Sequence, residues 1–300
     1  METLREILAP DFLLRNSLCT SLLVGAACPV IGVFLVLRRM AFLGVALPQI
    51  SSTGVALALA LHVWFGPEHS HNHGASHSVA LLGAFGFSLL AVIALAIMDR
   101  QRDGRTDGRL GTAYVVATAA SILLLAKCPQ AEQTWLHLFK GEIIAVTGVE
   151  LLRSFGLLAA VVGLLLLCRR TFLLVSYDPD LATILRVPVG RWNLFLFLLI
   201  GVTVGVSVLA VGPLITFGFM LIPSLIAHRF ATSMRQLFVW SSLIGLGAGF
   251  AGFHAAYSWD LPVGPASVGL LGGLYLTVTL VTWLARLGRV PGHSRQTGTR

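Results

Sequence analysis

The chain has 300 residues, of which 56% are hydrophobic and only 11% are charged. Roughly a quarter of the residues of a soluble domain are charged, so this composition excludes a soluble enzyme. The formal net charge of +8 comes from arginines between apolar runs, and it indicates membrane topology rather than a nucleic-acid partner. The chain is therefore predicted to be a multi-pass protein of the inner (plasma) membrane, in contact with the lipid bilayer and with no nucleic acid.

Several apolar runs reach the ~20 residues that a helix needs to cross a bilayer. Backbone hydrogen bonding in lipid permits only helices or closed barrels, and these runs do not alternate as barrel strands do. The expected fold is an all-α, polytopic transmembrane helix bundle of about eight or nine spans. The predicted spans are 16–37, 41–65, 79–98, 110–127, 150–168, 193–211, 213–228, 237–257 and 263–287. The seventh is short and begins at Gly212-Pro213, so a half-span and a count of eight remain open.

The arginines and lysines predict the orientation of these spans. With nine spans, sixteen of the 21 basic residues fall on one side of the membrane, and the positive-inside rule makes that side cytoplasmic. The N-terminus is then expected outside and the C-terminus in the cytoplasm. One transmembrane domain is predicted over 1–290, followed by a cytoplasmic tail over 291–300.

The connection 66–78 is predicted to be external, and it is rich in histidine. Neutral imidazole is a good ligand for zinc, copper, nickel and iron, and short histidine-rich tracts often bind metal. The HxHxH spacing does not match a rigid tetrahedral site, so a loop that captures a metal ion fits better. The alternative is a solvated loop whose histidines do little. The candidate metal ligands are His69, His71, His73 and His77.

Ionisable groups in the middle of a span are usually functional, but in this chain every Asp and Glu lies near a span end or in a connection. Polar candidates for a translocation path are Gln49, His62 and His254. Gln49 follows Pro48, which frees a backbone carbonyl inside span two, and a helix kink explains that position equally well. The two histidines lie toward the external ends of their spans, where an interfacial position without a ligand role is the simpler interpretation.

The connection 128–150 is predicted to be external and amphipathic, with Trp135 at the membrane interface. Glu142 in this segment is either a carboxylate at an external gate or an acid favoured by a helix N-terminus. No HExxH, GxSxG, P-loop or GxGxxG pattern occurs in a fitting context, so the chain is not expected to be an enzyme or to hydrolyse ATP.

Five motifs occur in order through nearly the whole chain and together resemble the permease subunit of metal-ion ABC importers, the zinc and manganese uptake family. They are 38–44 (RRMAFLG) with 54–56, 141–147 (GEIIAVT), 178–182 (DPDLA) with 187–189, 211–215 (VGPLI) through 221–224, and 260–265 (DLPVGP).

The resemblance implies a homodimeric pore that works with two copies of a separate cytoplasmic ATPase and with an extracytoplasmic metal-binding protein. ATP would bind to the partner subunit, and this chain would hold no cofactor of its own. The cytoplasmic segment 176–191 is long enough for a short helix and would couple the pore to the ATPase. The coupling residues that the resemblance implies are Asp178, Pro179, Asp180, Leu181, Ala182 and Pro188.

One position departs from the family pattern GDxxxH in span two, whose Asp and His are thought to contact the metal. Val45 and Gln49 stand at those two positions, so that site is not carried over. The leading hypothesis is a permease for a divalent metal. Zinc is favoured because the histidine loop is rich in nitrogen, whereas manganese prefers oxygen ligands. The alternatives are manganese or iron import, a siderophore- or cobalamin-type ABC permease, and an ATP-independent secondary transporter.

Overall fold

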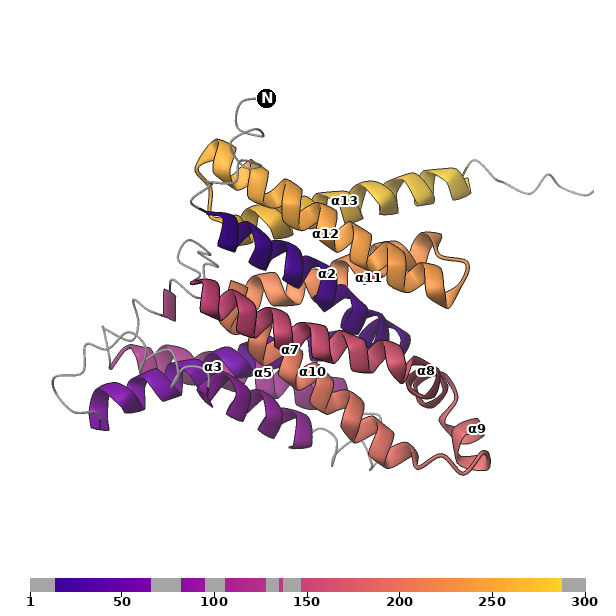
Figure 1. Cartoon of the computed structure of the whole chain (residues 1–300), viewed down its shortest axis with the longest axis horizontal. Helices are drawn as coiled ribbons and strands as arrows, with labels where there is room; N and C mark the ends of the chain where they lie inside the picture. The colour runs from indigo at the N-terminus through magenta and orange to yellow at the C-terminus, as the bar shows by residue number, and fades with distance from the viewer. Residues whose placement is uncertain (1–13, 66–81, 95–105, 128–134, 137–146, 288–300) are drawn as a thin grey trace, which may run out of the picture.

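The structure, a computed structural model, describes residues 14–65, 82–94, 106–127, 135–136 and 147–287 (Figure 1). The regular elements within those ranges are all helical, in agreement with the predicted all-α class. The labelled helices are α2 (Arg15–Leu37), α3 (Ala41–Phe65), α5 (Thr106–Leu125), α7 (Gly148–Leu167), α8 (Arg169–Tyr177), α9 (Pro179–Ile184), α10 (Val189–Val211), α11 (Pro213–Phe230), α12 (Met234–Trp259) and α13 (Val263–Leu287). A shorter apolar helix runs over Leu82–Ala94.

Eight of these helices are long and apolar enough to cross a membrane, which confirms the predicted count of about eight or nine. The seventh predicted span is the continuous 18-residue helix α11. At 1.5 Å per residue it is about 27 Å long, close to the thickness of a bilayer core. It follows Gly212, whose φ of 84° reverses the chain after α10. Leu82–Ala94 lies within the third predicted span, and the rest of that span is outside the described residues.

Helix α2 lies at the centre of the bundle, and glycines allow it to pack closely against α12. Gly245 and Gly249 form a G-x-x-x-G pattern on α12, the spacing that lets two membrane helices approach each other. A Cβ added at Gly25 of α2 would meet the Gly245 carbonyl oxygen at 2.7 Å, and one added at Gly249 would meet the Ser21 backbone at 3.1 Å. These small residues therefore set the distance between the two helices.

Serine hydroxyls add hydrogen bonds between α2 and its neighbours. Ser242 of α12 donates to the Ala26 carbonyl (2.6 Å), and Ser224 of α11 donates to the Pro29 carbonyl (3.0 Å). Pro29 has no N–H to bond the Gly25 carbonyl, so this part of α2 departs from regular helical hydrogen bonding. The two serine bonds go to the carbonyls of Ala26 and Pro29, which lie in this irregular stretch.

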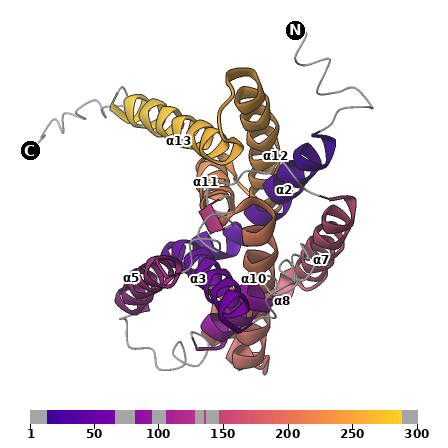
Figure 2. The same cartoon turned by 90° about the vertical axis from the view of Figure 1, so that its left-hand side faces the viewer.

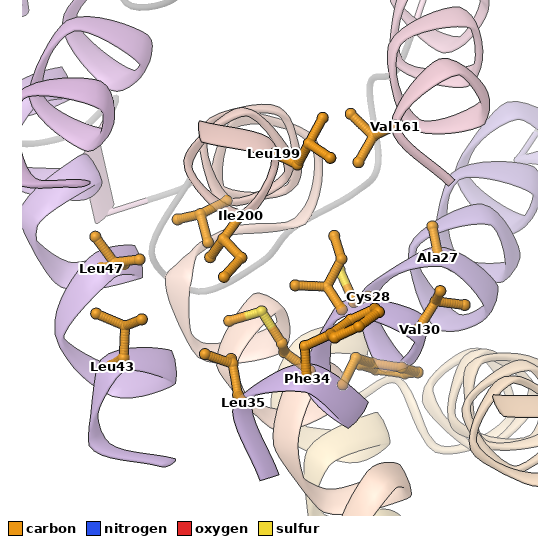
Figure 3. Close-up of a cluster of buried hydrophobic side chains, with 14 of the residues drawn as sticks. Ala27, Cys28, Val30, Phe34, Leu35, Leu43, Leu47, Val161, Leu199 and Ile200 are labelled. Atoms are coloured by element: carbon orange, nitrogen blue, oxygen red, sulfur yellow. The ribbon is translucent and has the colours of Figure 1, made fainter. Parts of the chain in front are cut away.

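The largest apolar core forms where α2, α3, α7 and α10 meet. Phe34 of α2, Leu43 of α3 and Ile200 of α10 are each at most 1% exposed, and Val161 of α7 joins them (Figure 3). By contrast, α5, α7 and α13 lie at the outside of the bundle and expose large apolar side chains such as Leu167 (Figure 2). Apolar side chains on those helices suit contact with lipid or with another membrane helix.

The connections that the structure describes fall into two groups at opposite ends of the bundle. The α2–α3, α7–α10 and α11–α12 connections lie at one end together with α8 and α9, and the α12–α13 turn lies at the other (Figure 1). Arg169, Arg186 and Arg191 belong to the first group, whereas Lys127 follows α5 and Arg153 is in the first turns of α7.

Candidate functional site

The predicted coupling segment contains helix α9, which begins with three favourable features. The Asp178 carboxylate Oδ1 accepts a hydrogen bond from the Leu181 backbone N–H at 2.9 Å, which is the N-cap interaction. Pro179 occupies the first helical position, where a missing N–H costs nothing. The Thr183 hydroxyl donates to the Pro179 carbonyl (2.9 Å). The DPDLA motif therefore encodes a helix start.

The other end of α9 is closed by a Schellman motif. The Val187 N–H bonds the Ala182 carbonyl (2.9 Å), and the Arg186 N–H bonds the Thr183 carbonyl (3.0 Å). Arg186 takes the left-handed conformation that this motif needs, with φ of 58°. Pro188 then precedes α10 as its N-cap residue. A helix of six residues would not persist alone in water, and these two caps fix it in place.

Helix α9 buries one residue and exposes an apolar surface. Ala182 is completely buried against α8 and α10, which anchors the helix to the bundle. On the outer side, Tyr177 and Ile184 are each 76% exposed, and Leu181 and Leu185 are also exposed. Exposed Asp180 and Arg186 border this apolar surface. An apolar centre with a charged rim is typical of a protein contact.

Helix α8 was not expected from the sequence, which predicted a short helix only within 176–191. It is amphipathic, and it buries Phe172 and Val175. The Phe172 ring packs edge-on against Phe34 of α2 (6.1 Å) and against Trp192 of α10 (5.4 Å). Helix α8, which leads directly into α9, is therefore connected to the core by aromatic contacts as well as by the chain.

The predicted path residues in the described ranges do not converge on a metal site. Gln49 is 7% exposed on α3, and Val45 lies one turn before it, half-buried. His62 is near the C-terminal end of α3, whereas His254 is on α12, where its Nδ1 is 3.1 Å from Ser258 Oγ. Among the residues that the structure describes, no group of three or more His, Cys, Asp or Glu could hold a metal ion. His69, His71, His73, His77 and Glu142 lie outside those residues.

A groove of about 450 Å³ between α2, α7 and α10 is lined in part by two charged residues, Glu150 and Arg153. The Glu150 carboxylate is used locally, since its Oε2 accepts from the Thr147 N–H (3.1 Å) while the Thr147 hydroxyl caps the Glu150 N–H. This capping box begins α7, and it explains why an acid stands at that position.

Trp135 corrects the prediction of an interfacial tryptophan. It is 9% exposed, and its Nε1–H donates to Ser52 Oγ at 2.9 Å. Ser52 is eleven residues from the start of α3 and thirteen from its end, so it lies about 17 Å from the start and about 20 Å from the end. The indole belongs to the same buried apolar cluster as Val55 and Leu125. The polar run Ser51-Ser52-Thr53 in an apolar span was the available signal, because buried hydroxyls need partners.

Comparison with known proteins gives one consistent result. The family model described as "ABC 3 transport family" matches residues 11–282. The manganese import system permease protein ScaB of Streptococcus gordonii is 25% identical over 255 residues, which is 85% of this chain and 86% of that protein. An uncharacterized membrane protein of Synechocystis is 29% identical over 280 residues, with 93% and 94% of the two chains covered.

Two solved structures have the same fold. PsaBC from Streptococcus pneumoniae in complex with Fab superposes with a TM-score of 0.76 at 23% identity, covering 92% of this chain and 94% of that chain. An inward-facing transporter described as of metal-chelate type gives a TM-score of 0.70 at 18% identity, covering 89% and 85%. At these identities the likeness establishes the arrangement of helices.

Proposed function

The chain belongs to the ABC 3 transport family, and we propose that it is the membrane-spanning permease subunit of an ATP-driven importer of a divalent metal ion. In this proposal two copies form the pore, two copies of a cytoplasmic ATPase drive it, and an extracytoplasmic binding protein delivers the ion. The observation that carries the proposal is helix α9, which is capped at both ends and presents an apolar surface at one end of the bundle.

Family membership and the eight spanning helices establish the general character of the chain. It is a multi-pass protein of the inner (plasma) membrane and a component of a transporter rather than an enzyme. ATP hydrolysis therefore belongs to a partner, and the chain must contain a surface through which that partner acts.

Helix α9 is suited to dock on the ATPase. Its exposed residues Leu181, Ile184 and Leu185 are large and apolar, but Asp178 and Asp180 on the same short helix are exposed and acidic. Those acids disfavour burial of this surface in lipid. A groove on a cytoplasmic protein would cover the apolar residues and leave the acids at its wet edge.

The same proposal fixes the orientation in the membrane. The end of the bundle that holds α8 and α9 would face the cytoplasm, with the N-terminus outside and the tail 291–300 inside. Reporter fusions placed after Arg186 and after Trp259 test this, because only the first should be active in the cytoplasm. The reversed pattern would contradict both the orientation and the docking role of α9.

The identity of the ion is the finer part of the proposal. The histidine loop supports zinc, whereas ScaB of Streptococcus gordonii, by its name, imports manganese. The oxygens of Gln49 and of the hydroxyl groups near it on α3 would suit manganese better than zinc. Zinc and manganese are therefore the two ions to test directly against each other.

Uptake into liposomes tests the proposal. The permease, its ATPase and its binding protein are reconstituted together, and entry of radioactive zinc and manganese is followed after ATP is added. ATP-dependent entry of either ion supports the proposal, and failure of both ions contradicts it. Gln49→Ala reports on the path. A variant with all four histidines of the loop changed to alanine reports on capture, and it should raise the half-saturating concentration of zinc more than that of manganese.

An importer for a metal chelate is the second candidate. Val45 and Gln49 supply no charged or imidazole ligand in span two, and a large chelate needs no site for a bare ion. The same liposomes loaded with ferric siderophore or cobalamin test this alternative, and uptake of the chelate without uptake of free ions would favour it. A secondary transporter is disfavoured because, within the described spans, each Asp and Glu lies at a helix end.

A further inference from the structure

Arg38 connects helix α2 to both sides of the segment that holds α9. Its Nε donates to Ser176 Oγ (2.9 Å), and its Nη2 donates to Asn193 Oδ1 (2.8 Å). Ser176 is the second-to-last residue of α8, just before α9. Asn193 is in the first turns of α10, just after α9. One guanidinium therefore bonds the chain where it enters and where it leaves the exposed helix.

The position of Arg38 at the end of α2 is fixed by a second Schellman motif. The Met40 N–H bonds the Leu35 carbonyl (3.0 Å), and the Arg39 N–H bonds the Val36 carbonyl (3.1 Å). Arg39 takes the left-handed conformation, with φ of 57°, and its side chain is exposed. The two adjacent arginines therefore differ, since Arg39 shapes the turn and Arg38 makes the contacts.

The guanidinium is partly enclosed by apolar groups, which strengthens its hydrogen bonds relative to water. Its carbon atom lies 5.7 Å from the centre of the Phe197 ring, a cation–π arrangement. Arg38, Ser176 and Asn193 are each half-buried. A planar fork with several donors can bond both acceptors at once, whereas a lysine ammonium on a flexible stem cannot reproduce that geometry.

Helix α2 contacts most of the other helices of the bundle. It packs along α11 and α12, and it also contacts α3, α7 and α10. Its Cys28 sulfur is 3.3 Å from Ser207 Oγ of α10. Phe34, one turn before Arg38, contacts Phe172 of α8 and Phe238 of α12. A displacement of α8 and α10 must therefore either break these contacts or move α2 with it.

We propose that Arg38 is the positioning residue that transmits displacement of α9 to helix α2, and so couples closure of the ATPase to rearrangement of the pore. The inference rests on the proposed function, in which α9 docks on the ATPase. The three residues Arg38, Ser176 and Asn193 form a joint in which α9 and its flanking turns move as one unit with α2. Without the joint, α9 is displaced while α2 stays in place.

The first experiment measures transport and hydrolysis together in the reconstituted complex. Arg38→Met removes both hydrogen bonds but keeps the apolar stem, and each bond to a charged group is worth enough to change an equilibrium about tenfold. We expect ion uptake per ATP hydrolysed to fall at least ~10-fold, with hydrolysis within ~2-fold of wild type. Ion uptake per ATP hydrolysed in Arg38→Lys should lie between the values for wild type and for Arg38→Met. Arg39→Gly is the matched control, because it removes a neighbouring charge and glycine accepts the left-handed turn.

Milder variants keep the test decisive if Arg38→Met does not assemble. Ser176→Ala and Asn193→Ala each remove one acceptor, and each should lower the coupling ratio by a smaller factor. Adding Asn193→Ala to Arg38→Met should cause no further loss, because the bond is already absent. Unchanged ratios in all of these variants, or equal losses in Arg39→Gly, would overturn the proposal.

A second readout does not depend on the cargo. Cys19 is half-exposed on α2, about 28 Å along the helix from Arg38. With Cys128 and Cys168 replaced by serine, the rate at which a maleimide labels Cys19 should change on ATP binding in the wild-type background and stay constant in Arg38→Met. A wild-type complex that shows this change but imports neither ion contradicts the proposed cargo alone. The role of Arg38 is contradicted if ATP does not change the labelling rate of Cys19 in the wild-type background, or if ATP changes it equally in Arg38→Met.

Discussion

Replacing Asp178 by alanine should weaken binding of the ATPase by destabilising helix α9. The change removes the 2.9 Å bond between the Asp178 carboxylate and the Leu181 N–H, which is the N-cap of this helix. Loss of an N-cap costs about 1 kcal/mol. A helix of six residues has too few hydrogen bonds of its own to offset that cost.

That free energy converts directly into a change in affinity. A cost of about 1 kcal/mol lowers the helical fraction of α9 roughly fivefold once that fraction is no longer close to one, and the apparent Kd rises by up to the same factor. The assay is titration of fluorescent ATPase with detergent-solubilised permease. Asn caps helices about as well as Asp, so Asp178→Asn should stay within ~2-fold of wild type while removing the charge.

The pair of variants separates capping from electrostatics. If Asp178→Asn weakens binding as strongly as Asp178→Ala, the carboxylate acts through its charge and the capping argument is wrong. If neither variant changes the Kd, then α9 either stays folded without its cap or does not contact the ATPase.

Three further predictions follow from exposure and packing. Ile184→Glu should abolish co-purification with the ATPase but leave the melting temperature of the isolated permease unchanged, because Ile184 is 76% exposed; a stable complex would argue against docking through this surface. Gly245→Leu should lower the melting temperature sharply, since its side chain would collide with α2, at a cost on the order of 3 kcal/mol. Gly247→Leu, on the same helix but facing open space, is its control, and equal melting temperatures would refute the packing argument. Trp135→Phe combined with Ser52→Ala in a double-mutant cycle should give a coupling of about 1 kcal/mol in chemical denaturation, and purely additive effects would show that the hydrogen bond contributes nothing.

Hydropathy alone predicted most of the spans because a helix that crosses the bilayer must be apolar over about 20 residues, and hydropathy measures this apolar character. The eight candidate spanning helices fall on predicted runs, and α11 is long enough to cross despite its Gly212-Pro213 start. The division of the α7–α10 connection into α8 and α9 was only partly predicted. A short helix was predicted within 176–191 from the length of that segment, and the structure shows that DPDLA supplies its cap and its first-turn proline. Helix α8 is short with a polar face, so it gives no signal on an apolar scale.

Contacts between distant parts of the chain were beyond sequence reasoning. Arg38 bonds residues 138 and 155 positions away, and nothing local to the RRM motif distinguishes its side chain from that of Arg39. Trp135 was assigned to the interface on residue type alone, because its partner Ser52 is 83 residues earlier in the chain. The candidate path residues Gln49, His62 and His254 were chosen because they are polar residues within spans. Among the described residues, no group of His, Cys, Asp or Glu forms a metal site that would join them.

The central position of α2 has a consequence for how the protein is made. Its bonds to α12 join residues 216 and 228 positions apart, Ala26 with Ser242 and Ser21 with Gly249. At 5–20 residues per second, the ribosome needs roughly 10–45 s after producing α2 before α12 exists. During that interval the Ser21 hydroxyl and the Ala26 carbonyl lack their partners from α12, and α2 resides in lipid or against an insertion factor. Nascent chains arrested before α12 should therefore be the species that membrane proteases and insertion chaperones encounter.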